Sequence, residues 1–140
     1  TEGMAHILNV IFYGTTQPAA IYCGLFKNNV TPALADTAAA KLGAAGTYGE
    51  CQDADYDDPA TNRPQYVVVP TSTAGVTNAA AKAEFTMAGS LTVYGAFLAT
   101  SQAKTATTGV LLCAKRFTTP RAVVADDELA VTYAISTTSS

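Results

Sequence analysis

Four aspartates lie close together in this chain, and their spacing resembles that of the ligands in a metal-binding loop. Asp53, Asp55 and Asp57 alternate along the sequence, and Asp58 follows directly. Calcium loops of the helix-loop-helix kind take oxygen ligands from alternating positions in this way. Such a loop then needs a glycine and a late glutamate, where this chain has Asp58 and Pro64. The sequence therefore predicts a solvated acidic loop. The alternative is a non-helical calcium site with Asp53, Asp55 and Asp57 as candidate ligands.

Other residue types offer little from which a catalytic site could be built. His6 is the one histidine, and no serine or cysteine motif accompanies it. A general base needs a partner within hydrogen-bonding reach, so we interpret His6 as a polar surface residue. The acidic run Asp126-Asp127-Glu128 is typical of a solvated turn before a strand. Neither of the common phosphate-binding glycine motifs occurs, and we expect no enzyme and no cofactor.

The cysteines indicate core packing rather than chemistry. Cys23, Cys51 and Cys113 are odd in number and widely separated, and they match no zinc-ligand spacing. Cys23 and Cys113 lie inside apolar runs, where a free thiol behaves as a small hydrophobic side chain. We predict buried free thiols, with a single disulfide as the alternative.

The composition indicates one domain whose surface carries few charges. The chain has 140 residues, of which 49% are hydrophobic and only 14% charged, against a usual charged share of about 25%. Alanine, threonine, serine and asparagine must then cover much of the surface. Such a surface is typical of a subunit that packs against neighbours.

Charge and hydropathy also exclude some partners. The net charge of −3 gives no clustered positive field, so we expect no nucleic-acid binding. No apolar run approaches the roughly 18 residues that a membrane-spanning helix needs. The N-terminal apolar stretch lacks a preceding basic segment, and we therefore expect neither a signal peptide nor a membrane partner.

Residues 1–14 carry the one clear helical pattern. Thr1 is a candidate N-cap and Gly14 a natural stop, and His6 and Asn9 fall on the polar side. Five apolar side chains recur at helical spacing and share one face: Met4, Ile7, Leu8, Ile11 and Phe12. Two interpretations stay open: this face closes one end of a sheet in the same domain, or it docks on another subunit.

The patterns in the rest of the chain predict mainly short strands. Residues 91–99 and 109–117 are two apolar runs joined by a polar insert, and this arrangement predicts a hairpin that is buried on both faces of at least one strand. Residues 33–41 fit either a short helix or an extended loop. Further strands are predicted over residues 20–26, 65–70, 82–87, 121–124 and 128–135, the last with Leu129, Val131, Tyr133 and Ile135 inward.

The expected architecture is mainly β: a single domain over residues 1–140, built as an antiparallel β-sandwich or partly open barrel of about six to eight strands. The N-terminal amphipathic helix occupies residues 1–14 and the β-sandwich residues 20–135. The serine- and threonine-rich tail of residues 136–140 is expected to fray.

Several motifs, taken in order, resemble a known group. Residues 22–32 hold Tyr-Cys-Gly-Leu-Phe followed by a threonine-proline turn, residues 93–98 hold Val-Tyr-Gly-Ala-Phe-Leu, and residues 111–120 end on a phenylalanine and a proline. With the loose match of residues 46–49 and the ending of residues 127–132, they resemble segments of small structural proteins of tailed-phage virions. Cys113 departs from the pattern, because the family usually has a large aromatic residue there, and the acidic loop at Asp53 looks like an insertion.

The resemblance implies a bacteriophage virion protein, made in the host cytoplasm. We expect it on the capsid surface in preference to the tail, because small β-rich modules also serve as capsid decoration proteins. The expected role is a capsid decoration or cement subunit, a homo-oligomer that binds the major capsid protein or other virion proteins. A tail- or fibre-associated protein is one alternative, and a calcium- or carbohydrate-binding β-sandwich is another of a different class. The partner-contact candidates are Met4, Ile7, Leu8, Ile11 and Phe12.

Overall fold

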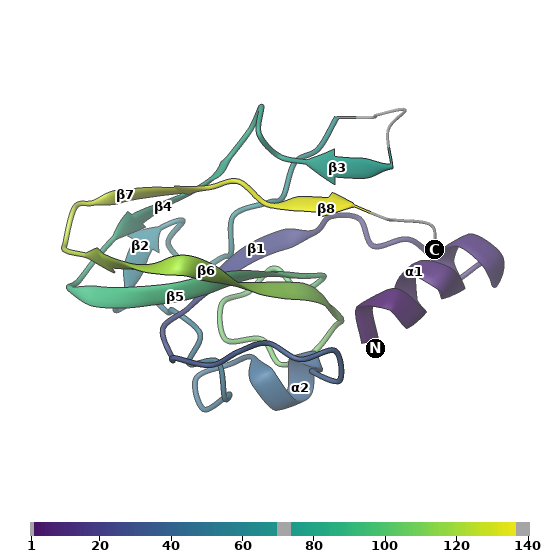
Figure 1. Cartoon of the computed structure of the whole chain (residues 1–140), viewed down its shortest axis with the longest axis horizontal. Helices are drawn as coiled ribbons and strands as arrows, with labels where there is room; N and C mark the ends of the chain where they lie inside the picture. The colour runs from purple at the N-terminus through teal and green to yellow at the C-terminus, as the bar shows by residue number, and fades with distance from the viewer. Residues whose placement is uncertain (1, 70–73, 137–140) are drawn as a thin grey trace.

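Three antiparallel sheets form the framework of the structure, a computed structural model that describes residues 2–69 and 74–136 (Figure 1). Over these residues the strand orders are β1-β5-β6, β2-β4-β7 and β3-β8, with no closed barrel. The predicted mainly-β, partly open sandwich with an N-terminal helix is confirmed. The elements are α1 (Glu2–Phe12), β1 (Tyr22–Phe26), α2 (Ala38–Lys41), β2 (Tyr56–Asp58), β3 (Gly75–Thr77), β4 (Ala83–Met87), β5 (Leu91–Ala99), β6 (Leu111–Val123), β7 (Glu128–Val131) and β8 (Ala134–Ser136).

The predicted hairpin of residues 91–117 is confirmed as the antiparallel pair β5 and β6. β6 is longer than predicted, because it continues through Pro120 to Val123. Val93 pairs with Arg121 and Gly95 with Arg116, so residues 117–120 stand opposite a single residue of β5 in a bulge. A proline is tolerated at such a bulge since it removes no regular ladder hydrogen bond.

β5 is buried on both faces over its second half, as its unbroken apolar run predicted. Ala96 and Leu98 belong to a core cluster that also holds Leu25 of β1, while Phe97 and Ala99 belong to a second cluster on the other face. Side chains alternate across a strand, so a continuous apolar run fills two cores at once. The sheet β1-β5-β6 is therefore the central layer, with β2-β4-β7 on one side and α2 on the other (Figure 1).

The strand predicted over residues 128–135 is split into β7 and β8. Buried Asn78 fills the break: its amide nitrogen donates to the carbonyl of Val131 (3.0 Å), and its oxygen accepts from the amide of Tyr133 (2.7 Å). The predicted alternation is confirmed, because Leu129, Val131, Tyr133 and Ile135 are all at least partly buried and their neighbours are exposed. Ser136 was expected in a frayed tail but pairs with Gly75 in β8; residues 137–140 lie outside the described residues.

Two other expectations differ from the structure. Residues 65–69 do not form a strand, because only Gln65 makes a bridge, to Tyr22, and Tyr66 instead inserts its ring into the core and donates to the carbonyl of Tyr133 (2.9 Å). β2 is a short strand within the predicted acidic loop, and β3 is a short strand in a segment for which no strand was predicted. The alanine-rich segment forms the four-residue helix α2, which Thr37 caps.

Candidate functional site

α1 lies at one end of the molecule and is attached through its N-terminal turn (Figure 1). One carboxylate oxygen of Glu2 accepts hydrogen bonds from the amides of Ala38 (2.9 Å) and Leu111 (2.8 Å). Gly3 packs directly on β6, where a Cβ would overlap the carbonyl oxygen of Leu112. These contacts fix the position of α1 on the edge of the central sheet.

The attachment turns the predicted apolar face of α1 outward. Gly3 is buried and His6 and Val10 are half-buried, so this side of the helix faces the domain. The five predicted contact residues are all exposed: Met4 by 53%, Ile7 by 41%, Leu8 by 45%, Ile11 by 66% and Phe12 by 81%. The interpretation in which this face is used up by the core of the same domain is therefore wrong: Gly3, His6 and Val10 contact the domain, and Met4, Ile7 and Ile11 line the open cleft beside it.

His6 consequently differs from its predicted role as a surface residue. It lies on the inner side of α1, and its Nε2 atom is buried without a hydrogen-bond partner among the described residues. The predicted stop at Gly14 is confirmed: Gly14 has φ of +76°, and the amides of Tyr13 and Thr15 both donate to the carbonyl of Asn9 (3.1 Å each). The N-cap candidate Thr1 lies outside the described residues.

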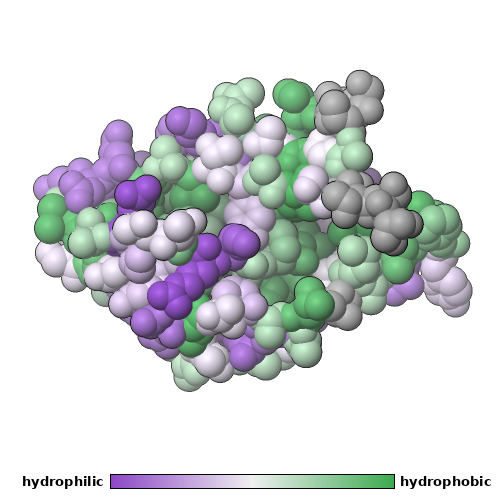
Figure 2. All heavy atoms as spheres, in the orientation of Figure 1, coloured by the Kyte–Doolittle hydropathy of each residue, from purple (hydrophilic) through white to green (hydrophobic). Residues whose placement is uncertain are grey.

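An open apolar cleft of about 690 Å³ runs beside α1. Its walls come from the helix and from segments that are distant in sequence, including Ile21, Leu34, Val68, Leu112 and Ile135. Hydrophobic side chains gather over this end of the molecule, while hydrophilic ones are concentrated at the other end (Figure 2). Exposed apolar area on this scale is uncommon on a free monomer and marks a contact surface.

The acidic groups in the cleft wall are already engaged within the chain. Glu2 is held by two backbone amides, as described above. Asp36 accepts from the hydroxyl of Tyr48 (2.8 Å) and pairs with Lys41 (3.2 Å). Partial burial acts against ionisation of Asp36, but the hydrogen bonds from the Ala33 amide, Tyr48 and Lys41 lower its pKa below the usual value. The cleft therefore presents apolar surface without a free charge.

The acidic loop does not bring its three candidate ligands together. Asp55 accepts both hydrogen bonds of a close pair with Lys27 (2.9 and 2.7 Å), and Asp53 pairs with Lys104 (3.1 Å). Asp57 is exposed on β2. In the part of the chain that the structure describes, no group of three or more potential metal-ligating side chains is found. The carboxylates thus hold lysines, and they do not form a ligand set.

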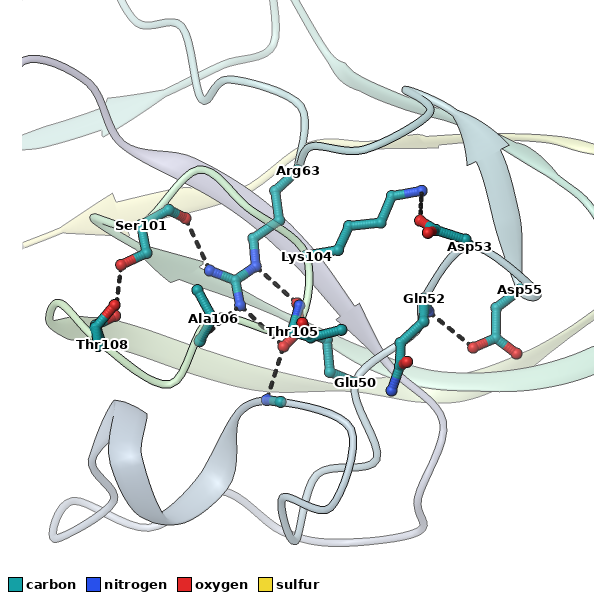
Figure 3. A network of polar contacts seen from close by, with 11 residues as sticks. Glu50, Gln52, Asp53, Asp55, Arg63, Ser101, Lys104, Thr105, Ala106 and Thr108 are labelled. Carbon is teal, nitrogen blue, oxygen red and sulfur yellow. Dashed lines mark hydrogen bonds and ion pairs between the residues drawn. The ribbon is translucent and has the colours of Figure 1, made fainter.

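A buried ion pair links the loops beneath the central sheet (Figure 3). Arg63 and Glu50 are 0% and 1% exposed, and Nε and one terminal nitrogen of Arg63 donate to the two carboxylate oxygens of Glu50 (2.7 and 2.9 Å). Arg63 also donates to the carbonyls of Ser101 (2.8 Å) and Ala106 (3.0 Å), and Glu50 accepts from the amide of Gly43 (2.9 Å). Every strong donor is matched, so this arrangement fixes three loops in place.

Lys104 extends this network and is buried as well. Its ammonium lies 3.7 Å from the centre of the Tyr56 ring and donates to the carbonyls of Tyr56 and Ala60 (2.8 Å each). The sequence carried no signal for these roles, because no spacing rule links Glu50, Arg63 and Lys104 across separate loops. Their contacts join these loops to one another.

The remaining candidates have structural roles. Residues 126–128 are exposed and include a turn in which the Asp127 carboxylate accepts from the amide of Val124 (2.9 Å), as the acidic run predicted. Cys23, Cys51 and Cys113 are free thiols: Cys23 and Cys51 are buried, as predicted, whereas Cys113 is only partly buried and packs against the core. Burial raises the pKa of both Cys23 and Cys51 to about 12, with a smaller contribution from Cys113 at Cys23 and from Asp55 at Cys51. Both thiols therefore stay protonated and unreactive near neutral pH.

No protein-family model matches the sequence, and the search of curated proteins gave no significant match. Neither described helix is long and apolar enough to cross a membrane. The outward apolar face of α1 and the cleft beside it form the surface that is suited to binding another molecule. Such a surface binds another apolar surface by removing both from water.

Proposed function

We propose that this chain is a structural subunit of a bacteriophage virion, and that it decorates the capsid shell by binding the major capsid protein. One observation carries the proposal: Met4, Ile7, Leu8, Ile11 and Phe12 form a fixed, outward apolar face with no partner in the described chain. Exposed apolar surface destabilises the soluble state unless an assembly covers it. A protein with this feature acts by assembly.

The low charge of the surface supports the same role. Only 14% of the residues are charged, and several of the charged side chains are buried, including Glu50, Arg63 and Lys104. These buried charges fix loops and offer no reacting group. The surface that is left resembles the surface of a subunit with neighbours more than that of a free enzyme.

The resemblance of the motifs in residues 22–32, 93–98 and 111–120 to small tailed-phage proteins supplies the virion context. These segments form β1, β5 and β6, the central sheet of the structure. A decoration role is preferred to the tail or fibre alternative because a small β-rich module with an apolar contact face suits repeated binding on a symmetric shell. The calcium- or carbohydrate-binding alternative is not favoured, because Asp53 and Asp55 are already paired with lysines.

The copy number of the chain per purified virion tests the proposal. Quantitative mass spectrometry with isotope-labelled peptides would be calibrated against the major capsid protein of the same particles. We expect on the order of hundreds of copies, close to the number of capsid subunits, because a symmetric shell repeats each contact. A few copies per particle would favour the tail or fibre alternative, and absence from particles would overturn the virion proposal.

A further inference from the structure

We propose that the apolar face of α1 and the adjoining cleft are the interface between two copies of this chain, in which α1 of each copy packs against α1 and the cleft of the other. The inference deepens the proposed function, because it names the first partner of the same surface. The pair, with this face buried between its two copies, would then bind the shell through the remaining surface of each copy.

The chemistry of the surface favours another copy of itself. The exposed face of α1 carries no charged side chain over residues 3–12, and the two acidic groups of the cleft wall, Glu2 and Asp36, are held within the chain. A partner recognised through charge would find nothing to pair with. Two identical apolar faces meet without repulsion between charges.

The size of the surface matches what a stable pair needs. Phe12 and the adjoining Tyr13 are 81% and 85% exposed, and the four aliphatic side chains of the face are 41–66% exposed. An aromatic side chain buries about 150–250 Å², so these six residues together offer on the order of 700 Å². A standard interface buries about 800 Å² on each partner, and the open cleft supplies the remainder.

The apolar face is also pre-organised in the single chain. Glu2 and Gly3 fix the N-terminal turn of α1 on Ala38, Leu111 and Leu112, which keeps the helix from folding its apolar side back onto the domain. An interface that is already ordered loses less conformational entropy on binding. Contact of α1 with α1 is two-fold symmetric, and it therefore closes after two copies and does not extend into a filament.

The test begins with the mass of the purified full chain by light scattering after gel filtration, over a range of concentrations. We expect about twice the monomer mass of 14.4 kDa. Leu8→Asp and Phe12→Asp should each weaken the dimer at least about 30-fold, since a charge would enter the centre of a desolvated contact. Asn9→Asp is the matched control, because Asn9 is exposed on α1 but lies off the apolar face, and it should leave the dimer unchanged.

A second variant keeps the test decisive if a charged substitution disturbs folding. Leu8 lies near the middle of α1, so in a two-fold pair it stands close to its counterpart. Under mild oxidation Leu8→Cys should form a disulfide between copies, and Asn9→Cys should not. Both cysteine variants are made in a Cys113→Ser background, because Cys113 is only partly buried and lines the cleft, whereas Cys23 and Cys51 are buried.

Three results would overturn the inference. These are a monomer at all concentrations, a dimer that Leu8→Asp and Phe12→Asp leave intact, and a monomer that copurifies with an apolar small molecule in the cleft. The outcomes of this test can be distinguished from the outcomes of the test of the proposed function. A monomer found in hundreds of copies on virions would leave decoration standing without the dimer, whereas a dimer absent from particles would leave the dimer standing without the virion role.

Discussion

Replacing Arg63 by methionine would leave the carboxylate of Glu50 buried without its counter-ion. Both side chains are at most 1% exposed, and two hydrogen bonds of 2.7 and 2.9 Å join them. Glu50 would keep the amide of Gly43 as a donor but would lose its only charged partner in the described chain. The substitution therefore isolates a charge in a region that water does not reach.

The structure sets the size of the expected effect. Removing one member of a buried ion pair costs about 3–5 kcal/mol, because the remaining charge has lost both water and partner. That is a large part of the roughly 5–15 kcal/mol by which a domain is stable. Glu50→Met should cost a similar amount, since it isolates the guanidinium of Arg63. The double variant removes both charges and should be less destabilised than the sum of the singles by at least about 2 kcal/mol.

Urea unfolding followed by far-ultraviolet circular dichroism would give the free energy of unfolding of each variant. The chain has no tryptophan and seven tyrosines, so tyrosine fluorescence serves as the second probe of a two-state transition. Lys27→Met is the control: Lys27 is 40% exposed in its pair with Asp55, and its loss should cost about 1 kcal/mol or less. Additive effects of Arg63→Met and Glu50→Met, or single losses no larger than the control, would refute the reasoning.

Three further predictions concern the core and the ionisable groups. Gly24→Ala should destabilise the domain by about 1–3 kcal/mol, measured by the same urea titration, because its Cβ would overlap the ring of Phe97; an unchanged midpoint would contradict the packing described for β1. The folded-state pKa of Asp36 is lowered despite partial burial, because its carboxylate accepts hydrogen bonds, so its contribution to stability is present above the usual pKa and is lost as the pH falls through the lowered one. Asp36→Asn should then lower the melting temperature at pH 7 and converge on the wild type in acid, and an equal difference at both pH values would contradict this. Cys23 and Cys51, whose pKa burial raises to about 12, should react with a thiol reagent at pH 8 only as fast as the chain unfolds, and rapid labelling in the native state would show that they are accessible.

Local patterns in the sequence were sufficient for the main elements of the central sheet. The hairpin of β5 and β6 follows from two apolar runs around a polar insert, and β5 is buried on both faces because its run does not alternate. The alternation of residues 128–135 likewise predicted which side chains point inward. It did not predict the break into β7 and β8, because the cause is Asn78, a residue more than 50 positions away.

The same limit applies to the charged groups. The spacing of Asp53, Asp55 and Asp57 is a property of the sequence, but their partners Lys27 and Lys104 come from other segments. Whether alternating carboxylates bind a cation or a lysine depends on which positive groups the fold brings to them. A spacing rule contains no such information.

The N-terminal helix shows most clearly what the sequence determines and what only the tertiary structure determines. Periodicity by itself determined that Met4, Ile7, Leu8, Ile11 and Phe12 share one face of a helix, because 3.6 residues per turn place them there in any fold. Only the tertiary structure decided that this face points outward. The deciding contacts, Glu2 with Leu111 and Gly3 with Leu112, join residues more than 100 positions apart, and no local pattern specifies which side of a helix such contacts hold against the domain.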